Sequence, residues 1–264
     1  MTQGVYYLKW MVMDQFEFKR FTFDHESQAL AFKDKIWADY SQYQAVSFQT
    51  EAVHLSQKKM CVFDMDSTLI NQEVIDEIAR LFGFYEQVSK ITESAMQGKL
   101  DFTQALRERC KLFAGMPEAR LHEILPKLSL SRGARELLAT LQSQKIKTAV
   151  VSGGFEFVLK HFQSKLSIDE VHAHTLELDS NRDFLGTVKD PIIDAHQKRS
   201  LVSKMKKELG ISTEETITVG DGANDIEMMK EAGISVSFCG KPKLMAAANT
   251  LILERNLALL EKFL

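Results

Sequence analysis

From residue 131 onward, short apolar runs alternate with segments whose apolar residues recur at helical spacing. The predicted strands cover residues 147–151, 171–178, 184–188, 216–219, 234–238 and 250–253. The predicted helices cover residues 134–142, 155–165, 194–209 and 244–248. Strands that alternate with helices favour a mostly parallel sheet with helices on both faces, a Rossmann-like α/β architecture. The strands at 171–178 and 184–188 flank a turn, so they are expected to form a hairpin.

An entirely apolar run at residues 60–63 predicts another buried strand, which Asp64 and Asp66 follow directly. Residues i and i+2 of an extended chain point the same way, so these two carboxylates can face one site while Met65 faces away. Two carboxylates this close repel each other unless a proton or a cation lies between them. The segment therefore indicates a metal site, although two aspartates at a solvated strand end would give the same pattern.

Between this strand and residue 131 the pattern is helical throughout. One apolar stripe covers residues 74–82 and stops at Gly83, and a second helix is expected from about 85 toward 98. Asp101 and Gln104 have the spacing of a capping box for a third helix, and Pro117 opens a fourth. Residues 73–130 are therefore expected to form a helical cap inserted into an α/β core of residues 58–72 and 131–264.

Residues 1–57 have a pattern of their own. Two strands near residues 6–12 and 16–23, a helix from about residue 27 and a third strand near 43–53 predict a small ββαβ unit. Phe16 and Phe18 share one parity while Phe21 and Phe23 share the other, which suggests a bulge or bend in the second strand. This α+β appendage is expected to pack or to join two copies into a homodimer. A regulatory ligand-binding module is the alternative.

Composition narrows the classes of function. The chain has 264 residues, 45% of them hydrophobic and 26% charged, and its net charge of −3 argues against broad nucleic-acid binding. No apolar run approaches the roughly 20 residues of a membrane helix, and the amino terminus does not resemble a secretion signal. The three cysteines are widely spaced and lack metal-ligand spacing, so a reduced, cytoplasmic protein is expected.

Two more predicted strands end in polar clusters. Ser152 and Gly153 join a strand to a helix, where glycine and free backbone N–H groups suit an anion such as phosphate. Asp221 follows another strand, and Asn224 and Asp225 begin the next helix, so their oxygens can converge and suit Mg²⁺. A tight turn and helix capping are the plainer explanations. Ligands of parallel sheets bind beyond the carboxyl ends of the strands, and all three clusters lie at such ends.

Three segments, in order, resemble motifs of the haloacid-dehalogenase phosphatase superfamily: FDMDSTLIN, VVSGGF and VGDGANDIEM. The resemblance runs from about residue 58 to the carboxyl terminus. Within the superfamily, NQEVIDEIAR and MQGKLDFTQALRER are most similar to the phosphoserine phosphatases. This resemblance implies Mg²⁺-dependent hydrolysis of O-phospho-L-serine to L-serine and phosphate through an aspartyl phosphate, the last step of serine biosynthesis.

The resemblance also implies roles for the residues that do the chemistry. Asp64 matches the nucleophile, and Asp66 matches the general acid that protonates the leaving oxygen and later deprotonates water. Lys198 matches the lysine of the third motif. Asp221 matches a metal ligand, together with the Asp64 carboxylate and the Asp66 carbonyl. Asp225 matches a group that supports the metal site.

Further matches concern the substrate. Ser152 and the Gly153 amide match phosphate ligands, and Asn224 matches a group that orders the substrate. Glu73 matches the group that meets the substrate ammonium, and Arg109 matches the one that meets its carboxylate, for which a guanidinium is suited by bidentate pairing.

Thr68, in the first motif, is expected to support the two aspartates from behind. Another small-molecule phosphatase, or a phosphotransferase with the same aspartyl phosphate, is the alternative function. A signalling receiver domain is a further alternative, but such a module needs neither Asp66 nor a cap. A catalytically inactive binding protein would be expected to have lost a motif residue.

Overall fold

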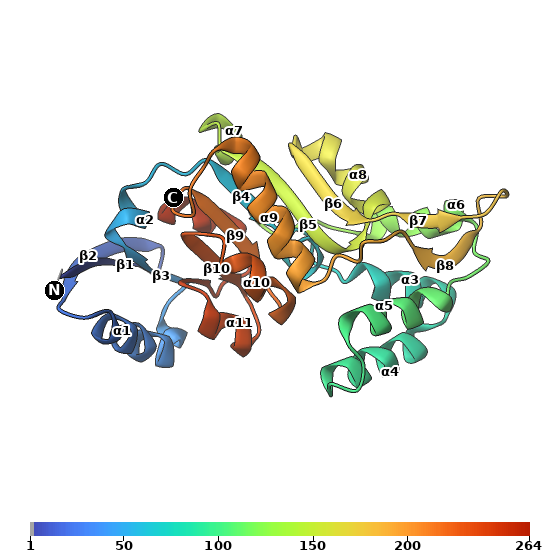
Figure 1. Cartoon of the computed structure of the whole chain (residues 1–264), viewed down its shortest axis with the longest axis horizontal. Coiled ribbons are helices and arrows are strands. Elements are labelled where there is room, and N and C mark those ends of the chain that lie inside the picture. The colour runs from blue at the N-terminus through green and yellow to red at the C-terminus, as the bar shows by residue number, and fades with distance from the viewer. Residues whose placement is uncertain (1–2) are drawn as a thin grey trace.

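One nine-stranded sheet runs through the molecule in the computed structural model, which describes residues 3–264 (Figure 1). In spatial order its strands are β2 (Gln15–Phe23), β1 (Gly4–Val12), β3 (Ala45–Thr50), β11 (Thr250–Ile252), β10 (Ile234–Phe238), β9 (Thr216–Gly220), β4 (Met60–Phe63), β5 (Lys147–Phe155) and β6 (Glu170–His174). The six strands from β11 to β6 are parallel, which confirms the predicted α/β core. The run at residues 60–63 lies inside this parallel part as β4, with β9 and β5 on either side.

Helices cover both faces of the parallel strands (Figure 1). They are α7 (Ala134–Ser143), α8 (Glu156–Leu166), α9 (Ala195–Leu209), α10 (Ile226–Met229) and α11 (Pro242–Ala247). Met60 and Val62 of β4 pack with residues of α9 and α10, whereas Cys61 and Phe63 point to the opposite face, in the core that contains α7 and α8. All four side chains are buried, because a strand of a parallel sheet is covered on both faces.

The inserted helices form a cap at the end of the sheet where β4, β5 and β9 finish (Figure 1). They are α3 (Val74–Phe82), α4 (Tyr85–Met96), α5 (Phe102–Lys111) and α6 (Glu118–Leu121). The helix ends follow the predicted signals. Gly83 ends α3 with φ of 77°, and the side chain of Asp101 accepts a hydrogen bond from the Gln104 N–H at the start of α5.

The predicted hairpin at residues 171–178 and 184–188 is correct only in part. The first of these segments divides into β6, which joins the main sheet, and β7 (Leu176–Leu178), which pairs with β8 (Phe184–Val188). The chain leaves the main sheet at Thr175, whose carbonyl accepts a hydrogen bond from Lys189 N–H beyond β8. Gly186 of β8 lies against the end of α5, where a Cβ would be 3.3 Å from the Cα of Lys111 and 2.9 Å from the Cβ of Ala114, just beyond the helix. The small hairpin therefore packs on the cap.

The amino-terminal residues form the predicted ββαβ unit, with α1 (Glu26–Ala38) between β2 and β3. The predicted bulge in β2 is wrong, because the register with β1 is unbroken from Phe23 to Gln15. The even-numbered and odd-numbered phenylalanines of β2 instead lie on opposite faces of the hairpin. Phe21 and Phe23 lie against Phe32 of α1, at ring-centroid distances of 4.7 and 5.6 Å, and Phe16 faces the other way, toward the carboxyl-terminal turn.

The third amino-terminal strand ends earlier than predicted. The hydroxyl of Thr50 accepts a hydrogen bond from Val53 N–H and caps α2 (Glu51–Leu55), so residues 51–53 are helical. Strand β3 pairs antiparallel with β11, and the ββαβ unit thereby extends the central sheet. Within residues 3–264, no helix has both the length and the apolarity that a bilayer span requires.

Candidate active site

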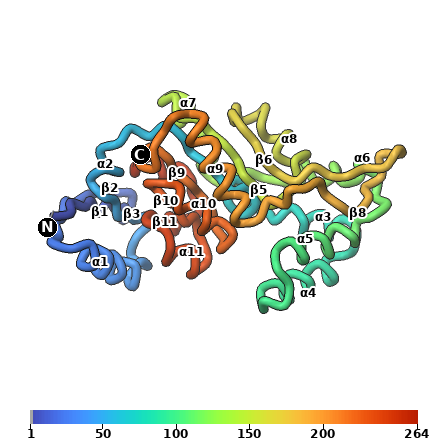
Figure 2. Tube along the Cα trace, viewed as in Figure 1, coloured from blue at the N-terminus to red at the C-terminus, as the bar shows by residue number. Residues whose placement is uncertain are grey.

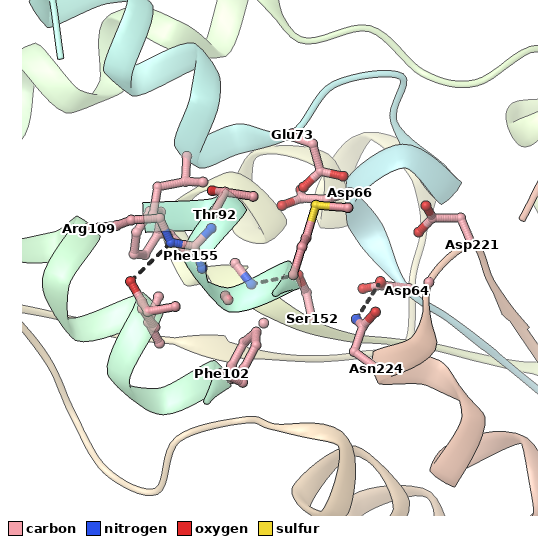
Figure 3. Close-up of a pocket in the computed structure, with 18 of the residues that line it drawn as sticks. Asp64, Asp66, Glu73, Thr92, Phe102, Arg109, Ser152, Phe155, Asp221 and Asn224 are labelled. Atoms are coloured by element: carbon pink, nitrogen blue, oxygen red, sulfur yellow. Dashed lines mark hydrogen bonds between the residues drawn. The ribbon is translucent and has the colours of Figure 1, made fainter. Parts of the chain in front are cut away.

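A cavity of about 360 Å³ lies between the cap and the carboxyl ends of β4, β5 and β9 (Figure 3). Eight of the eleven residues predicted for the site line it: Asp64, Asp66, Glu73, Arg109, Ser152, Gly153, Asp221 and Asn224. Thr68, Lys198 and Asp225 are fully buried and do not line the cavity. A cavity of this size suits a small molecule.

Asp64 is fixed from one side and open on the other. It is 4% exposed, and its Oδ1 accepts hydrogen bonds from Met65 N–H at 2.7 Å and from Lys198 Nζ at 2.9 Å. Its Oδ2 has one long contact, 3.5 Å to Asn224 Nδ2. The carboxylate is therefore held in place through one oxygen, while the other remains available to a ligand.

Asp66 is the second residue of the segment Met65–Leu69. Its backbone is extended (φ of −65°, ψ of 136°), and the next residue, Ser67, bends the chain with φ of 54°. The Oδ1 atom of Asp66 is buried without a hydrogen-bond partner among the described residues. Burial, followed by the nearby charges of Glu73 and Asp64, raises the pKa of this carboxyl well above its ordinary value. The side chain is thus suited to holding a proton beside Asp64.

Lys198 joins Asp64 to Asp225 from behind. It extends from the first turn of α9, is 1% exposed, and lies 2.9 Å from Asp64 Oδ1 and 2.8 Å from Asp225 Oδ1. Burial alone would lower the pKa of this amine, but Asp225 and Asp64 outweigh it and raise the pKa. Lys198 is therefore charged and fixes the orientation of both carboxylates.

The carboxylates of Asp64, Asp221 and Asp225 offer oxygens that all lie within 4.8 Å of one another. Burial and the charges of the neighbouring aspartates raise the pKa of Asp221 to about 7 and that of Asp225 to about 6. Oxygen donors that crowd together in this way fit a hard divalent cation, which removes their mutual repulsion. The oxygens of Asp225 already contact Lys198 and Gly222 N–H, so Asp64 and Asp221 are the freer donors.

The end of β5 brings the Ser152–Gly154 segment to the cavity. The Ser152 hydroxyl accepts a hydrogen bond from Gly154 N–H at 2.9 Å, which leaves its proton for a ligand. A Cβ at Gly153 would lie 2.7 Å from the Phe102 ring, and one at Gly154 would lie 2.9 Å from Cε of Met65. A side chain at Gly153 would therefore displace the Phe102 ring, whereas at Gly154 it would meet the flexible end of Met65.

The cap side of the cavity carries two opposite charges. Glu73 precedes α3, and its Oε1 accepts a hydrogen bond from the Ser67 hydroxyl at 2.7 Å. Arg109 extends from α5, partly buried, and its Nε donates to Ala105 O at 3.1 Å. Within residues 3–264, no carboxylate oxygen lies within 4.0 Å of the Arg109 guanidinium. Its helix neighbour Arg107 points outward and lies 3.5 Å from Asp190.

Two residues at the site were not singled out from the sequence. Lys241 follows β10 and lines the cavity, and a polar residue after a strand end was the signal that could have found it. His174 ends β6, with its Nδ1 3.1 Å from Gly153 O and its Nε2 accepting from Ile193 N–H at 2.7 Å. It connects the Ser152–Gly154 segment to the chain before α9. No local pattern distinguishes it from the other histidines.

Thr68 is buried, and its hydroxyl has no hydrogen-bond partner among the described residues. It lies behind Asp66, in the turn that follows β4, and contributes no atom to the cavity wall.

Comparisons with known proteins agree with this geometry. Residues 58–233 match the family model of the haloacid dehalogenase-like hydrolases. The chain is 39% identical to a phosphoserine phosphatase of Methanocaldococcus jannaschii, over 78% of this chain and 98% of that protein. It is 41% identical to a phosphoserine phosphatase of Haemophilus influenzae, over 75% of this chain and 63% of that longer protein.

Solved structures give the same result. A haloacid dehalogenase family hydrolase from Salmonella enterica serovar Typhi superposes with a TM-score of 0.85 at 26% identity, over 99% of this chain and 98% of that one. A phosphoserine phosphatase with an analogue of its phospho-aspartyl intermediate superposes with a TM-score of 0.74 at 39% identity, over 79% of this chain and 100% of that one. The chain therefore belongs to the haloacid dehalogenase-like hydrolase family and, within it, to the phosphoserine phosphatases.

Proposed function

We propose that this chain hydrolyses O-phospho-L-serine to L-serine and inorganic phosphate, the last step of serine biosynthesis, through a phosphoryl group carried on Asp64. The phosphoserine phosphatases that it resembles at about 40% identity support this reaction. The choice of substrate rests on the cap side of the cavity. There the guanidinium of Arg109 has no carboxylate partner among residues 3–264, and Glu73 supplies a negative charge.

A partly buried guanidinium gains most from a ligand that brings its own carboxylate, because bidentate pairing satisfies several N–H donors at once. Glu73 attracts a cation in the same way, and a ligand ammonium supplies it. The Ser152–Gly154 segment, at the other end of the cavity, suits a phosphate. A small molecule that carries all three groups, phosphate, ammonium and carboxylate, matches phosphoserine.

In the reaction, the free Oδ2 of Asp64 attacks the phosphorus atom, and the bond between phosphorus and the serine oxygen breaks. Asp66 gives its proton to that oxygen as L-serine leaves. A water molecule then gives a proton to Asp66 and attacks the phosphorus, which releases phosphate and restores Asp64. Lys198 holds Oδ1 throughout, so the attacking oxygen keeps its direction.

The phosphate oxygens are bound by the Ser152 hydroxyl and the Gly153 N–H, and Asn224 orients the substrate beside Asp64. Mg²⁺ would be held by the carboxylates of Asp64 and Asp221 and by the main-chain carbonyl of Asp66. When bound, it offsets the repulsion between the attacking carboxylate and the phosphate dianion. Asp225 and Thr68 support this arrangement from behind.

We further propose that the chain works as three parts, an amino-terminal appendage of residues 1–57, a core of residues 58–72 and 131–264, and a cap of residues 73–130. The reaction takes place at the boundary between core and cap. A cytoplasmic location, expected from the dispersed cysteines, is part of the same proposal.

The experiment uses the purified full chain and four phosphomonoesters. Phosphoserine carries both charged groups, phosphoethanolamine lacks the carboxylate, phospholactate lacks the ammonium, and p-nitrophenyl phosphate lacks both. We expect kcat/KM to be highest for phosphoserine, to fall when either group is missing, and to vanish in excess chelator and return with Mg²⁺. An Asp64→Asn preparation controls for contaminating phosphatases. Equal kcat/KM for all four esters would contradict the substrate, and full turnover in chelator would contradict the metal.

A further inference from the structure

The outer edge of β2 is a free edge of the central sheet. It lies at the end of the molecule opposite the cap, and within residues 3–264 no strand pairs with it (Figure 2). All residues from Gln15 to Arg20 are exposed, and the Phe18 side chain is 61% exposed. Sheet edges are usually protected by proline, a bulge, a short strand or charged side chains. Strand β2 has nine residues, an unbroken register and no proline, and its charged residues, Glu17, Lys19 and Arg20, are of both signs.

The hydrogen-bonding direction of β2 follows from its neighbours. Gln44 N–H donates to Met11 O, so the odd-numbered residues of β1 turn their backbone groups toward β3. The even-numbered residues of β1 therefore bond to β2, where the register places odd-numbered residues opposite them. It follows that Phe16, Phe18 and Arg20 present their backbone N–H and C=O groups to the free edge.

We propose that this edge binds a second copy of the chain, with the two β2 strands antiparallel and Phe18 opposite Phe18 of the second copy. A two-fold axis perpendicular to the sheet keeps the faces of the two sheets continuous, so one residue must face itself. Phe18 directs its backbone groups outward, as a hydrogen-bonded pair at the axis requires.

The charges favour this register over those centred on the neighbouring charged residues. With Phe18 at the axis, Glu17 lies opposite Lys19 of the second copy, and Lys19 lies opposite Glu17 of the second copy. On the other face, Phe16 lies opposite Arg20 of the second copy, and Arg20 opposite Phe16, where a guanidinium can cover an aromatic ring. Registers with Glu17, Lys19 or Arg20 at the axis place two like charges opposite each other.

These side chains are available for such pairing. No cation of the described residues lies within 4.0 Å of the Glu17 carboxylate. The Nζ atom of Lys19 lies over the Phe21 ring, 5.4 Å from its centroid, and no carboxylate among residues 3–264 lies within 4.0 Å of it. Arg20 makes one exposed contact, 3.7 Å to Glu51. Exposed pairs of this kind contribute little and are easily exchanged. Because the edge lies far from the cavity, pairing is expected to leave phosphatase turnover unchanged.

Charge reversal tests the register through sedimentation velocity of the full chain over a concentration series. We expect wild type to sediment as a dimer. Glu17→Lys and Lys19→Glu should each raise the dissociation constant at least about tenfold, and the double variant should restore the wild-type value because both pairs are re-formed with reversed signs. Glu136→Lys, an exposed change of the same charge on α7, should behave as wild type. A monomeric wild type, or a double variant no tighter than the single ones, would overturn the proposal.

Cross-linking tests the axis independently. In the proposed pair, residue 18 meets itself at a Cα separation near 5.5 Å, which a disulfide can span. Phe18→Cys is therefore expected to give a covalent dimer under a mild added oxidant, and Thr22→Cys, on the same face but away from the axis, to give little. Equal cross-linking of the two variants, or none of either, would exclude this register. Turnover in all variants, measured alongside, reports that the fold is intact.

Discussion

Two cations beside the same cavity differ in what they pair with. Lys198 is 1% exposed and lies within 2.9 Å of two carboxylates, those of Asp64 and Asp225. Arg109 is partly buried on the cap side, and its polar partner among the described residues is the carbonyl of Ala105. The charge of Lys198 is thus satisfied within the protein, whereas that of Arg109 is left for a ligand. In the proposed reaction, one side of the cavity therefore acts on the phosphoryl group and the other binds the rest of the substrate.

The largest expected effect belongs to the phosphoryl side. Asp64→Asn removes the attacking oxygen charge, and we expect kcat to fall on the order of 10⁴-fold or more for every phosphomonoester tested. Steady-state kinetics with phosphoserine and p-nitrophenyl phosphate measures this. A loss confined to phosphoserine would mean that Asp64 recognises the substrate rather than acting on phosphorus, and the division into two sides would not hold.

The next largest effect is expected in the free energy of unfolding, which should differ between variants of Lys198 and Arg109. Lys198→Met leaves two buried carboxylates without their shared partner, so we expect a loss of about 3–5 kcal/mol in the free energy of unfolding. Arg109→Met removes a charge that has no carboxylate partner in the described part of the chain, so stability should be unchanged within about 0.5 kcal/mol or slightly higher. Urea unfolding of both variants measures the difference, in chelator so that metal binding does not enter. Equal losses would show that Arg109 is paired as Lys198 is.

A smaller, pH-dependent effect is expected at His174. Burial lowers its pKa below 6.5, so the unfolded chain binds a proton before the folded one does as pH falls. The contribution of His174 to the stability of the fold therefore decreases as pH falls below about 6.5. His174→Leu should be less stable by about 1–3 kcal/mol at pH 8, because Gly153 C=O and Ile193 N–H lose their partner.

The difference between this variant and wild type should narrow as pH falls from 6.5 toward 5, since the leucine variant lacks the proton uptake. His196→Leu, at an exposed histidine on α9, is the matched control and should differ little from wild type at pH 8. A gap that stays constant with pH would mean that His174 does not remain neutral in the folded chain.

The sequence predicted those helices and strands whose apolar pattern and end signals lie within the element itself. The strand at Met60–Phe63 is apolar on both faces, and the cap helices begin and end at recognisable residues such as Asp101 and Gly83. Because each polar cluster follows a parallel strand, the sequence also predicted that the clusters meet at the carboxyl ends of the strands. The roles assigned to the individual residues rest on resemblance and stay predictions.

Other features depend on partners distant in sequence. The pairing of β3 with β11 joins residues about 200 positions apart, and no local pattern selects that partner. The false bulge in β2 arose because the parity of its phenylalanines was assigned to one buried face, whereas both faces of the hairpin carry aromatic contacts. His174 was passed over because its partners, Gly153 and Ile193, are each about 20 residues away.

The central claim is that Arg109 reads the carboxylate of the substrate, and the most direct test is the ratio of kcat/KM for phosphoserine to that for phosphoethanolamine. We predict that Arg109→Ala lowers this ratio on the order of 10- to 100-fold, with little change for phosphoethanolamine itself. Arg107→Ala, on the same helix but facing outward, should leave the ratio at its wild-type value. An unchanged ratio in Arg109→Ala would contradict the claim.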